Sequence, residues 1–157
     1  MVTILRVIAL VSTGLMAGIF LGHRMGLHYA LPELSPSSFV QLGQAIGVRY
    51  MRFMPPLVFT ALLSSLLWLA MLRAQWRTPE FWLVAASTCA TLVIIAATRT
   101  VNVPLNNQLM TWSIASPPTN LQEIWAPWER VNTVRSVLAT GSLVLEALAV
   151  SLRAYAR

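Results

Sequence analysis

The residues most able to do chemistry lie in a polar stretch that interrupts an otherwise apolar chain. Between residues 99 and 135, three asparagines within six positions are followed by three tryptophans, two glutamates and two further arginines. Amide and guanidinium groups beside aromatic rings can hold a ligand's oxygen while the rings contact its apolar part. We therefore predict the functional site here, with the candidate residues Arg99, Asn102, Asn106, Trp125, Trp128, Asn132 and Arg135.

Arg135 and the two candidate tryptophans also have ordinary explanations. Arg135 stands where the last apolar segment begins, so its guanidinium either points toward Asn102, Asn106 or a ligand oxygen, or extends to lipid headgroups. Trp125 and Trp128 are either walls of a site or members of the aromatic belt at a membrane interface. The sequence leaves both alternatives open.

Two histidines, His23 and His28, follow directly after the first apolar segment. An imidazole can accept and return a proton near neutral pH, or ligate a metal or haem. The five-residue spacing matches no zinc signature, and a histidine at a membrane interface is often without function. We predict no cofactor and take His23 as a candidate catalytic base, with haem or metal ligation as the alternative.

Glu146 lies deep inside the last apolar segment, where a charged carboxylate is costly. Counting residues from the chain ends places it level with hydroxyl residues on the other three segments. We therefore predict a buried polar layer that includes Glu146, Ser64 and Ser87. The layer is either functional or serves to join the helices through a protonated carboxyl. In both cases the neighbours of Glu146 should be hydroxyls, with no arginine among them.

The composition points to an integral membrane protein. Of the 157 residues, 57% are hydrophobic and only 10% are charged, so a soluble fold would lack the polar residues to cover its apolar surface. The net charge of +6 comes from 11 arginines against 5 glutamates, with no lysine or aspartate. No basic run occurs away from the ends of the apolar segments, so we expect the bilayer, and not a nucleic acid, to be the partner of this charge.

Four apolar segments predict a single all-α domain, a four-helix bundle that spans the membrane. The expected spans are residues 4–21, 54–72, 81–97 and 137–152. Pro55 and Pro56 suit the first turn of the second span. A short amphipathic helix over residues 37–52 should therefore lie between the first two spans, on the surface or across one end of the bundle. Both chain ends and the connection over residues 73–80 should share one side of the membrane.

The order of these features resembles the anthrone oxygenase-like family of small membrane proteins (DUF1772). The matching pieces are Gly14-Leu-Met-Ala-Gly-Ile-Phe, Leu31-Pro-Glu-Leu with the helix after it, Asn102-Val-Pro-Leu-Asn106 and Trp128-Glu-Arg-Val-Asn-Thr-Val-Arg135. The resemblance covers nearly the whole chain. It implies a four-helix membrane fold and, as in characterised fungal members, oxygenation of an anthrone to an anthraquinone.

One departure from the family pattern concerns the base. Members often have histidine where this chain has Asn132. If that histidine accepts the proton elsewhere, this chain either lacks the activity or takes its base from His23 or His28. The resemblance also implies that Arg135 and Asn106 would hold the enolate oxygen of a flat aromatic substrate. We expect a bacterial cell membrane, with the termini cytoplasmic because the arginines on the other side stand among site residues.

A non-enzymatic accessory or carrier protein is the competing interpretation. The predicted polar layer around Glu146 fits that interpretation better than it fits oxygenase chemistry at the opposite end of the bundle. A haem or metal oxidoreductase is the third class, but the counting argument separates Glu146 from both histidines. The visible absorption spectrum and metal content of the purified protein would distinguish the three classes.

Overall fold

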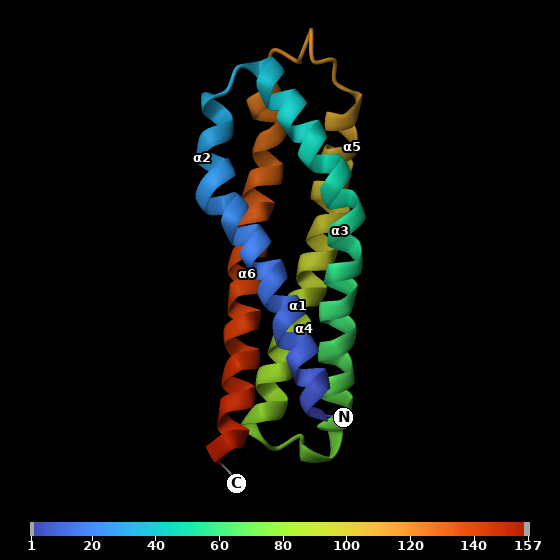
Figure 1. The fold of residues 1–157 in the computed structure, drawn as a ribbon, viewed down its shortest axis with the longest axis vertical. Helices are drawn as coiled ribbons and strands as arrows, with labels where there is room; N and C mark the ends of the chain where they lie inside the picture. The colour runs from blue at the N-terminus through green and yellow to red at the C-terminus, as the bar shows by residue number, and fades with distance from the viewer. Residues whose placement is uncertain (1, 156–157) are drawn as a thin grey trace.

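Four long helical rods run the length of the molecule in the computed structural model, which describes the backbone of residues 2–155 and the side chains of residues 3–152 (Figure 1). The described residues contain no strand. The elements in chain order are α1 (Val2–Gly22), the π-helical turn η1 (His23–Leu27), α2 (His28–Ala30), the 3-10 turn η2 (Leu31–Glu33), α3 (Pro36–Met71), the 3-10 turn η3 (Arg73–Gln75), α4 (Pro79–Ala97), the π-helical turn η4 (Thr98–Asn102), α5 (Val103–Thr111) and α6 (Leu121–Tyr155).

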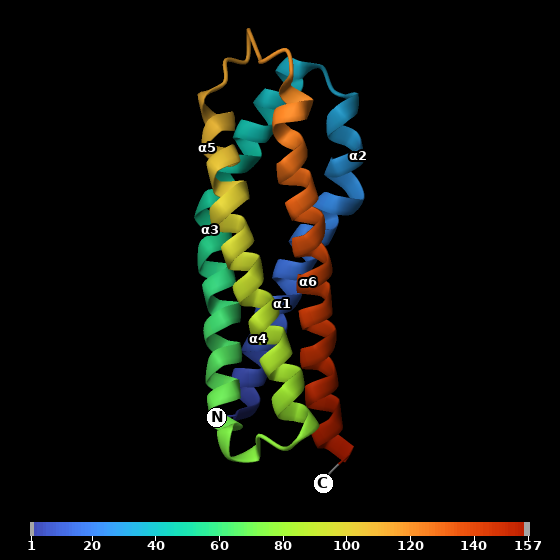
Figure 2. The same ribbon diagram turned by 180° about the vertical axis from the view of Figure 1, so that it is seen from behind.

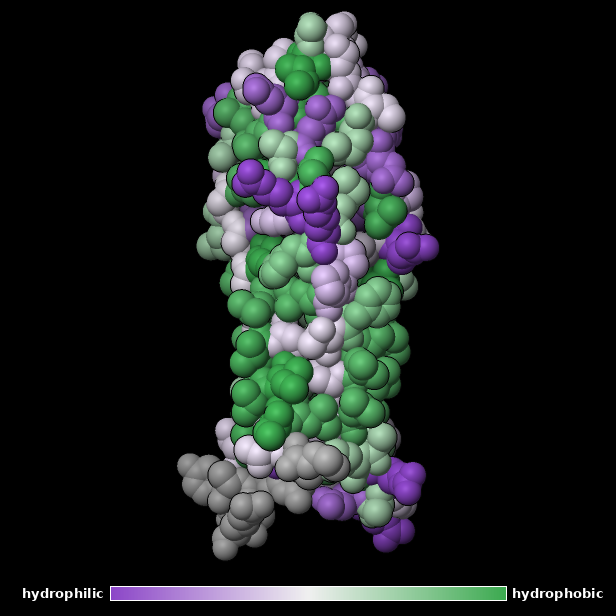
Figure 3. Space-filling model, turned by 45° about the vertical axis from the view of Figure 1, so that its right-hand side comes forward, coloured by the Kyte–Doolittle hydropathy of each residue, from purple (hydrophilic) through white to green (hydrophobic). Residues whose placement is uncertain are grey.

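The four rods are long and apolar enough to span a membrane, and they extend over Thr3–Glu33, Pro36–Met71, Pro79–Thr111 and Leu121–Leu152. With a rise of about 1.5 Å per residue, each is roughly 15–25 Å longer than the hydrocarbon core of a bilayer. The space-filling view shows an apolar band between two polar ends, and the upper polar region extends further along the length of the molecule (Figure 3). The prediction of an all-α, four-span membrane bundle is confirmed.

Each rod packs against two neighbours. α1 lies between α3 and α6, and α4 lies between the same two helices on the other side. The described chain ends and the η3 connection lie together at the lower end, while α2, α5 and the loop before α6 lie at the upper end (Figures 1 and 2). This arrangement confirms the predicted division of the connections. We call the upper end, residues 23–53 and 98–135, the headpiece.

The helix expected over residues 37–52 forms, but it is not a separate amphipathic element. It is the first half of α3, which continues through Pro55 and Pro56 to Met71, and its first part slants across the headpiece (Figure 1). Ser35 caps it, accepting a hydrogen bond from the Ser38 backbone N–H at 3.2 Å. The prolines remove two helical N–H donors, but the carbonyls left without them belong to the exposed Met51 and Arg52, where water or headgroups can bind them.

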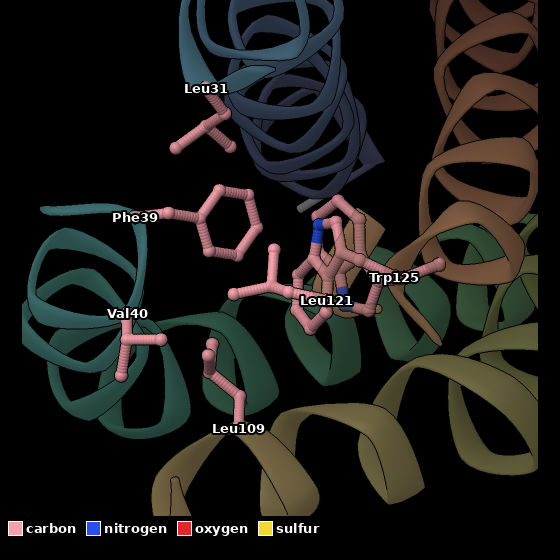
Figure 4. Close-up of a cluster of buried hydrophobic side chains, with 7 residues drawn as sticks. Leu31, Phe39, Val40, Leu109, Leu121 and Trp125 are labelled. Carbon is pink, nitrogen blue, oxygen red and sulfur yellow. The ribbon is translucent and has the colours of Figure 1, made fainter. Parts of the chain in front are cut away.

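The core is divided into three clusters along the bundle axis. One lies near the chain ends (Ala9, Trp68, Leu72, Val84, Ala149), one is central (Met16, Ala17, Phe20, Ala61, Ile94, Ala139), and one fills the headpiece (Leu31, Phe39, Val40, Leu109, Leu121, Trp125, Trp128). In the headpiece cluster, Phe39 of α3 points at Trp125 of α6, with Leu31 beside them (Figure 4). This cluster includes two of the candidate site residues, Trp125 and Trp128.

The buried polar layer around Glu146 has the predicted character. Its Oε1 accepts hydrogen bonds from the Ser65 hydroxyl at 2.7 Å and the Ser87 hydroxyl at 2.9 Å, and no arginine of the described residues bonds to it. Ser64 is buried too, but its hydroxyl donates to the Thr60 carbonyl on its own helix. Adjacent helical residues point about 100° apart, so only one of the two serines can face α6.

Replacing Glu146 tests what the polar layer contributes to stability. Glu146→Ala should lower the free energy of unfolding by about 1–3 kcal/mol, because two buried hydroxyls lose their shared acceptor. Glu146→Gln keeps an oxygen at that position and should cost less. The measurement is reversible unfolding in mixed detergent micelles, with Ser64→Ala as the control. Equal losses for Gln and Ala would show that the hydroxyl bonds do not set the stability of the layer.

Candidate functional site

Two π-helical turns shape the headpiece. In η1 the His28 backbone N–H donates to the His23 carbonyl, and in η4 the Val103 N–H donates to the Thr98 carbonyl, five residues earlier in each case. The proline after Val103 explains the second turn, because its ring has no N–H to continue the α-helical ladder. A π-helical turn aligns residues five apart, and such turns are frequent at functional sites.

A carboxylate on α6 joins both histidines. His23 Nε2 lies 3.1 Å from Glu129 Oε1, and His28 Nδ1 lies 2.8 Å from Glu129 Oε2. The indole N–H of Trp125 also donates to Oε1, at 3.2 Å. A carboxylate only accepts, so we assign the facing proton to each imidazole; the neutral His28 ring then keeps its lone pair on Nε2. The five-residue spacing of the histidines therefore serves one shared carboxylate.

Trp128 is held at both its backbone and its ring. Its carbonyl accepts from Asn102 Nδ2 at 3.2 Å, and its indole N–H donates to Asn106 Oδ1 at 2.7 Å. The ring stacks on Trp125, with centroids 4.9 Å apart, and packs against His23 at 4.7 Å. The two asparagines thus fix the position of Trp128, whose ring in turn contacts His23.

Arg135 is buried on the other side of Trp128. Its guanidinium donates to Thr98 Oγ1 at 3.2 Å and to Asn132 Oδ1 at 2.8 Å. Its Cζ lies 4.5 Å from the Phe20 ring centroid and 5.3 Å from that of Trp128. The side chain is buried and does not extend to headgroups. No described carboxylate forms an ion pair with it, and its Nε has no hydrogen bond, so two hydrogen bonds to neutral oxygens and two ring faces are what stabilise the guanidinium.

The predicted candidates meet at this level of the bundle, with one exception. Asn102, Asn106 and Trp128 contact one another, and Arg135 and His23 lie against Trp128, which confirms the expected meeting of these groups. Asn132 is buried and joins the cluster through Arg135. Arg99 lies on η4 but is exposed, and it forms no hydrogen bond with the other candidates. Trp125 and Trp128 are buried in the headpiece core and are not exposed belt residues.

Glu129 is the residue that sequence reasoning missed. It stands inside the Trp128–Arg135 motif, one helical turn after Trp125 and one turn before Asn132, so these three residues share a helix face. That spacing was the available signal. The sequence does not show that His23 and His28 both face Glu129, because their alignment depends on the π-helical turn.

A small cavity of about 110 Å³ opens beside this carboxylate. Its lining comes from α2, η2, α3 and the start of α6, and consists of His28, Leu31, Pro32, Phe39, Gln122, Trp125, Ala126 and Glu129. A cavity of this size holds a few waters or a molecule of similar size. It is well below the roughly 300 Å³ at which pockets for drug-sized ligands begin. The walls are mostly apolar, with an imidazole and a carboxylate at one side.

Metal ligation was the alternative for the histidines. Over the described side chains, no group of three His, Cys, Asp or Glu residues has an arrangement that could hold a metal ion. In this structure the three groups that come nearest to such a set, His23, His28 and Glu129, hydrogen-bond to one another.

A family model described as Anthrone oxygenase matches residues 46–145. The chain belongs to the anthrone oxygenase family. No curated protein and no solved structure matches the chain. The matched range contains Trp128 and the two asparagines bonded to it, together with Glu129 and Arg135. It begins after His23 and His28. The family pattern therefore covers the α4 and α6 side of the site, and the two imidazoles come from the unmatched first helix.

We call the two hydrogen bonds that join Trp128 to Asn102 and Asn106 the clamp. The bond between the Trp128 ring and Asn106 can be tested by a double-mutant cycle. Trp128→Phe removes the indole N–H and Asn106→Ala removes its acceptor, so each should destabilise the protein by about 1 kcal/mol. The double variant should lose less than the sum, because both single changes break the same bond. Unfolding free energies in micelles provide the measurement, and Asn107→Ala, at an exposed neighbour, is the control. Strict additivity would mean that the 2.7 Å contact contributes no coupling.

Proposed function

We propose that this protein oxidises a planar aromatic of the anthrone type with dioxygen, without a bound cofactor. In the overall reaction one CH₂ group and one O₂ give one C=O group and one water. A base first removes a proton from the acidic CH₂ carbon. The resulting carbanion adds O₂ to form a C–O bond and a peroxide. Loss of the second proton from that carbon with cleavage of the O–O bond then releases water and leaves the quinone carbonyl.

The observation that carries the proposal is the His28–Glu129 pair at the wall of the apolar cavity. Glu129 fixes the imidazole through Nδ1–H, so that Nε2 can accept a proton, and the carboxylate stabilises the imidazolium that results. His28 is the better candidate of the two histidines, because it lines the cavity while His23 is packed against Trp128. Membership of the anthrone oxygenase family supports the same reaction.

Positive charge on α6 would favour the anionic intermediate. Arg135 lies against Trp128 and has no ion-pair partner among the described residues, so its charge is available to stabilise an enolate electrostatically. In this proposal Asn102 and Asn106 act as positioning residues, because they hold Trp128 between the charge and the histidines.

A three-ring substrate needs more room than the cavity offers. About 110 Å³ accommodates only part of such a molecule, so Leu31 and Phe39 must move away from Trp125 when it binds. These residues come from the segment around the η2–α3 junction, which is joined to α6 here by apolar contacts. The proposed substrate would therefore enter from the headpiece end and lie against the face of Trp125.

Oxygen uptake by the purified protein with an anthrone tests the reaction. His28→Gln should lower the rate by about 10²–10⁴, the usual contribution of a general base. Glu129→Gln should lower it too, because the ring loses its fixed orientation. His23→Gln should have the smaller effect, and Arg52→Gln, an exposed arginine on α3, is the matched control for general damage. A larger loss in His23→Gln than in His28→Gln would transfer the base to His23.

Two further variants test the remaining residues. Unchanged uptake in Arg135→Gln would remove Arg135 from the mechanism. Asn132→His places histidine where the family often has it, and it should change the rate little if His28 already serves as the base. A rise in rate would mean that the departure at Asn132 had disabled the enzyme. No uptake and no aromatic binding by the wild type would favour the accessory-protein alternative.

We also propose that both chain ends face the cytoplasm of a bacterial cell and that the headpiece faces outward. The support is that the arginines of the headpiece stand among the candidate site residues, so we assign them to the site and not to a cytoplasmic surface. A single cysteine at the exposed Ser116, in a Cys89→Ser background, should react with a membrane-impermeant maleimide added to intact cells. Labelling only after the cells are opened would reverse the orientation.

A further inference from the structure

A second hollow runs along the outer seam between the first rod (α1, η1 and α2) and α6, and it is separate from the cavity at Glu129. It is a groove of about 720 Å³, lined by Leu21, Arg24, Met25, Tyr29, Thr133, Ser136, Val137, Thr140, Gly141, Val144 and Leu145. Met25 is 69% exposed and Val137 is 67% exposed, so the groove opens on the outer surface of the bundle. The oxygenation chemistry proposed above does not use it.

Small residues on α6 create the groove. A Cβ added at Gly141 would meet no heavy atom within 4 Å. Ser136 and Thr140 lie in the preceding turn and are also short side chains. The lining extends from Thr133 to Leu145, about 18 Å along the helix axis. The groove is thus elongated along α6, a shape that suits an extended hydrocarbon chain better than a compact ring system.

One end of the groove has unsatisfied polar groups. Arg24 lies at the headpiece end with its guanidinium over the Tyr29 ring, 5.2 Å from the centroid. Its Nη1 is buried without a hydrogen-bond partner, and so is Thr140 Oγ1 further along the groove. A buried donor without an acceptor costs free energy that a bound oxygen would recover. A guanidinium is well matched to the oxygens of a phosphate.

We propose that this groove binds an anionic phospholipid of the surrounding bilayer. The phosphate would accept hydrogen bonds from Arg24, and one acyl chain would lie along α6 past Val137 and Gly141. Arg24 lies two residues after the apolar helix α1 (Val2–Gly22), where the headpiece begins. Basic residues at the ends of apolar membrane segments are the ones that meet anionic lipid headgroups. The apolar walls below it would then contact the chain.

Native mass spectrometry of the detergent-purified protein, titrated with phosphatidylglycerol or phosphatidylcholine, tests the site. The wild type should bind phosphatidylglycerol about tenfold more tightly, because it is a net anion, whereas the choline ammonium of phosphatidylcholine cancels its phosphate charge. Arg24→Gln should remove this preference. Gly141→Leu should weaken both lipids, because the new side chain occupies the path of the acyl chain. Arg52→Gln and Ala86→Leu, at exposed positions outside the groove, are the matched controls.

The results that overturn the proposal are equally specific. They are a lipid preference that survives Arg24→Gln, lipid binding unchanged by Gly141→Leu, or controls that lose as much as the groove variants. Displacement of the lipid by an anthrone would assign the groove to the aromatic substrate, and a dimer lost in Gly141→Leu would assign it to a second copy of the chain. If Gly141→Leu does not fold, Val144→Trp blocks the groove from an exposed position.

Discussion

The headpiece depends on one tryptophan that is fixed from two directions. Asn102 bonds to the Trp128 carbonyl and Asn106 accepts from its ring, so neither the helix nor the indole can rotate freely. His23 and the Arg135 guanidinium then pack against that ring. Because η4 and α5 supply the asparagines and α6 the tryptophan, the clamp also sets how these two rods meet in the headpiece.

The clamp keeps opposite charges apart on the same helix. Glu129 and Arg135 are six residues apart, about 9 Å along the axis of α6. The Trp128 ring contacts both Arg135 and His23, which is one of the partners of Glu129. The carboxylate is occupied by two imidazoles and an indole, whereas the guanidinium has only neutral oxygens and rings. An ion pair between them would have neutralised both. Their separation leaves a hydrogen-bonded carboxylate on one side of the ring and a guanidinium without an ion pair on the other.

Local patterns in the sequence were sufficient for the spans, the hydroxyl neighbours of Glu146, and the meeting of Asn102, Asn106, Arg135 and His23. Apolar length and polar position carry that information directly. Two features were hidden. The proline pair suggested a helix start, but exposed carbonyls allow α3 to pass through it. Glu129 was overlooked because its partners are aligned by a π-helical turn, and periodicity of 3.6 residues places His23 and His28 on different faces.

The π-helical turn has a consequence for how this site tolerates changes in chain length. Such a turn contains one residue more than the α-helical turn it replaces, so η1 behaves as a one-residue insertion absorbed inside a continuous rod. Deleting that residue would leave the transmembrane part of α1 intact but would turn everything beyond it by about 100°. His28 would swing away from Glu129 while His23 stayed in place. The rotation of the headpiece relative to the membrane-spanning part of α1 is thus set by one extra residue in η1.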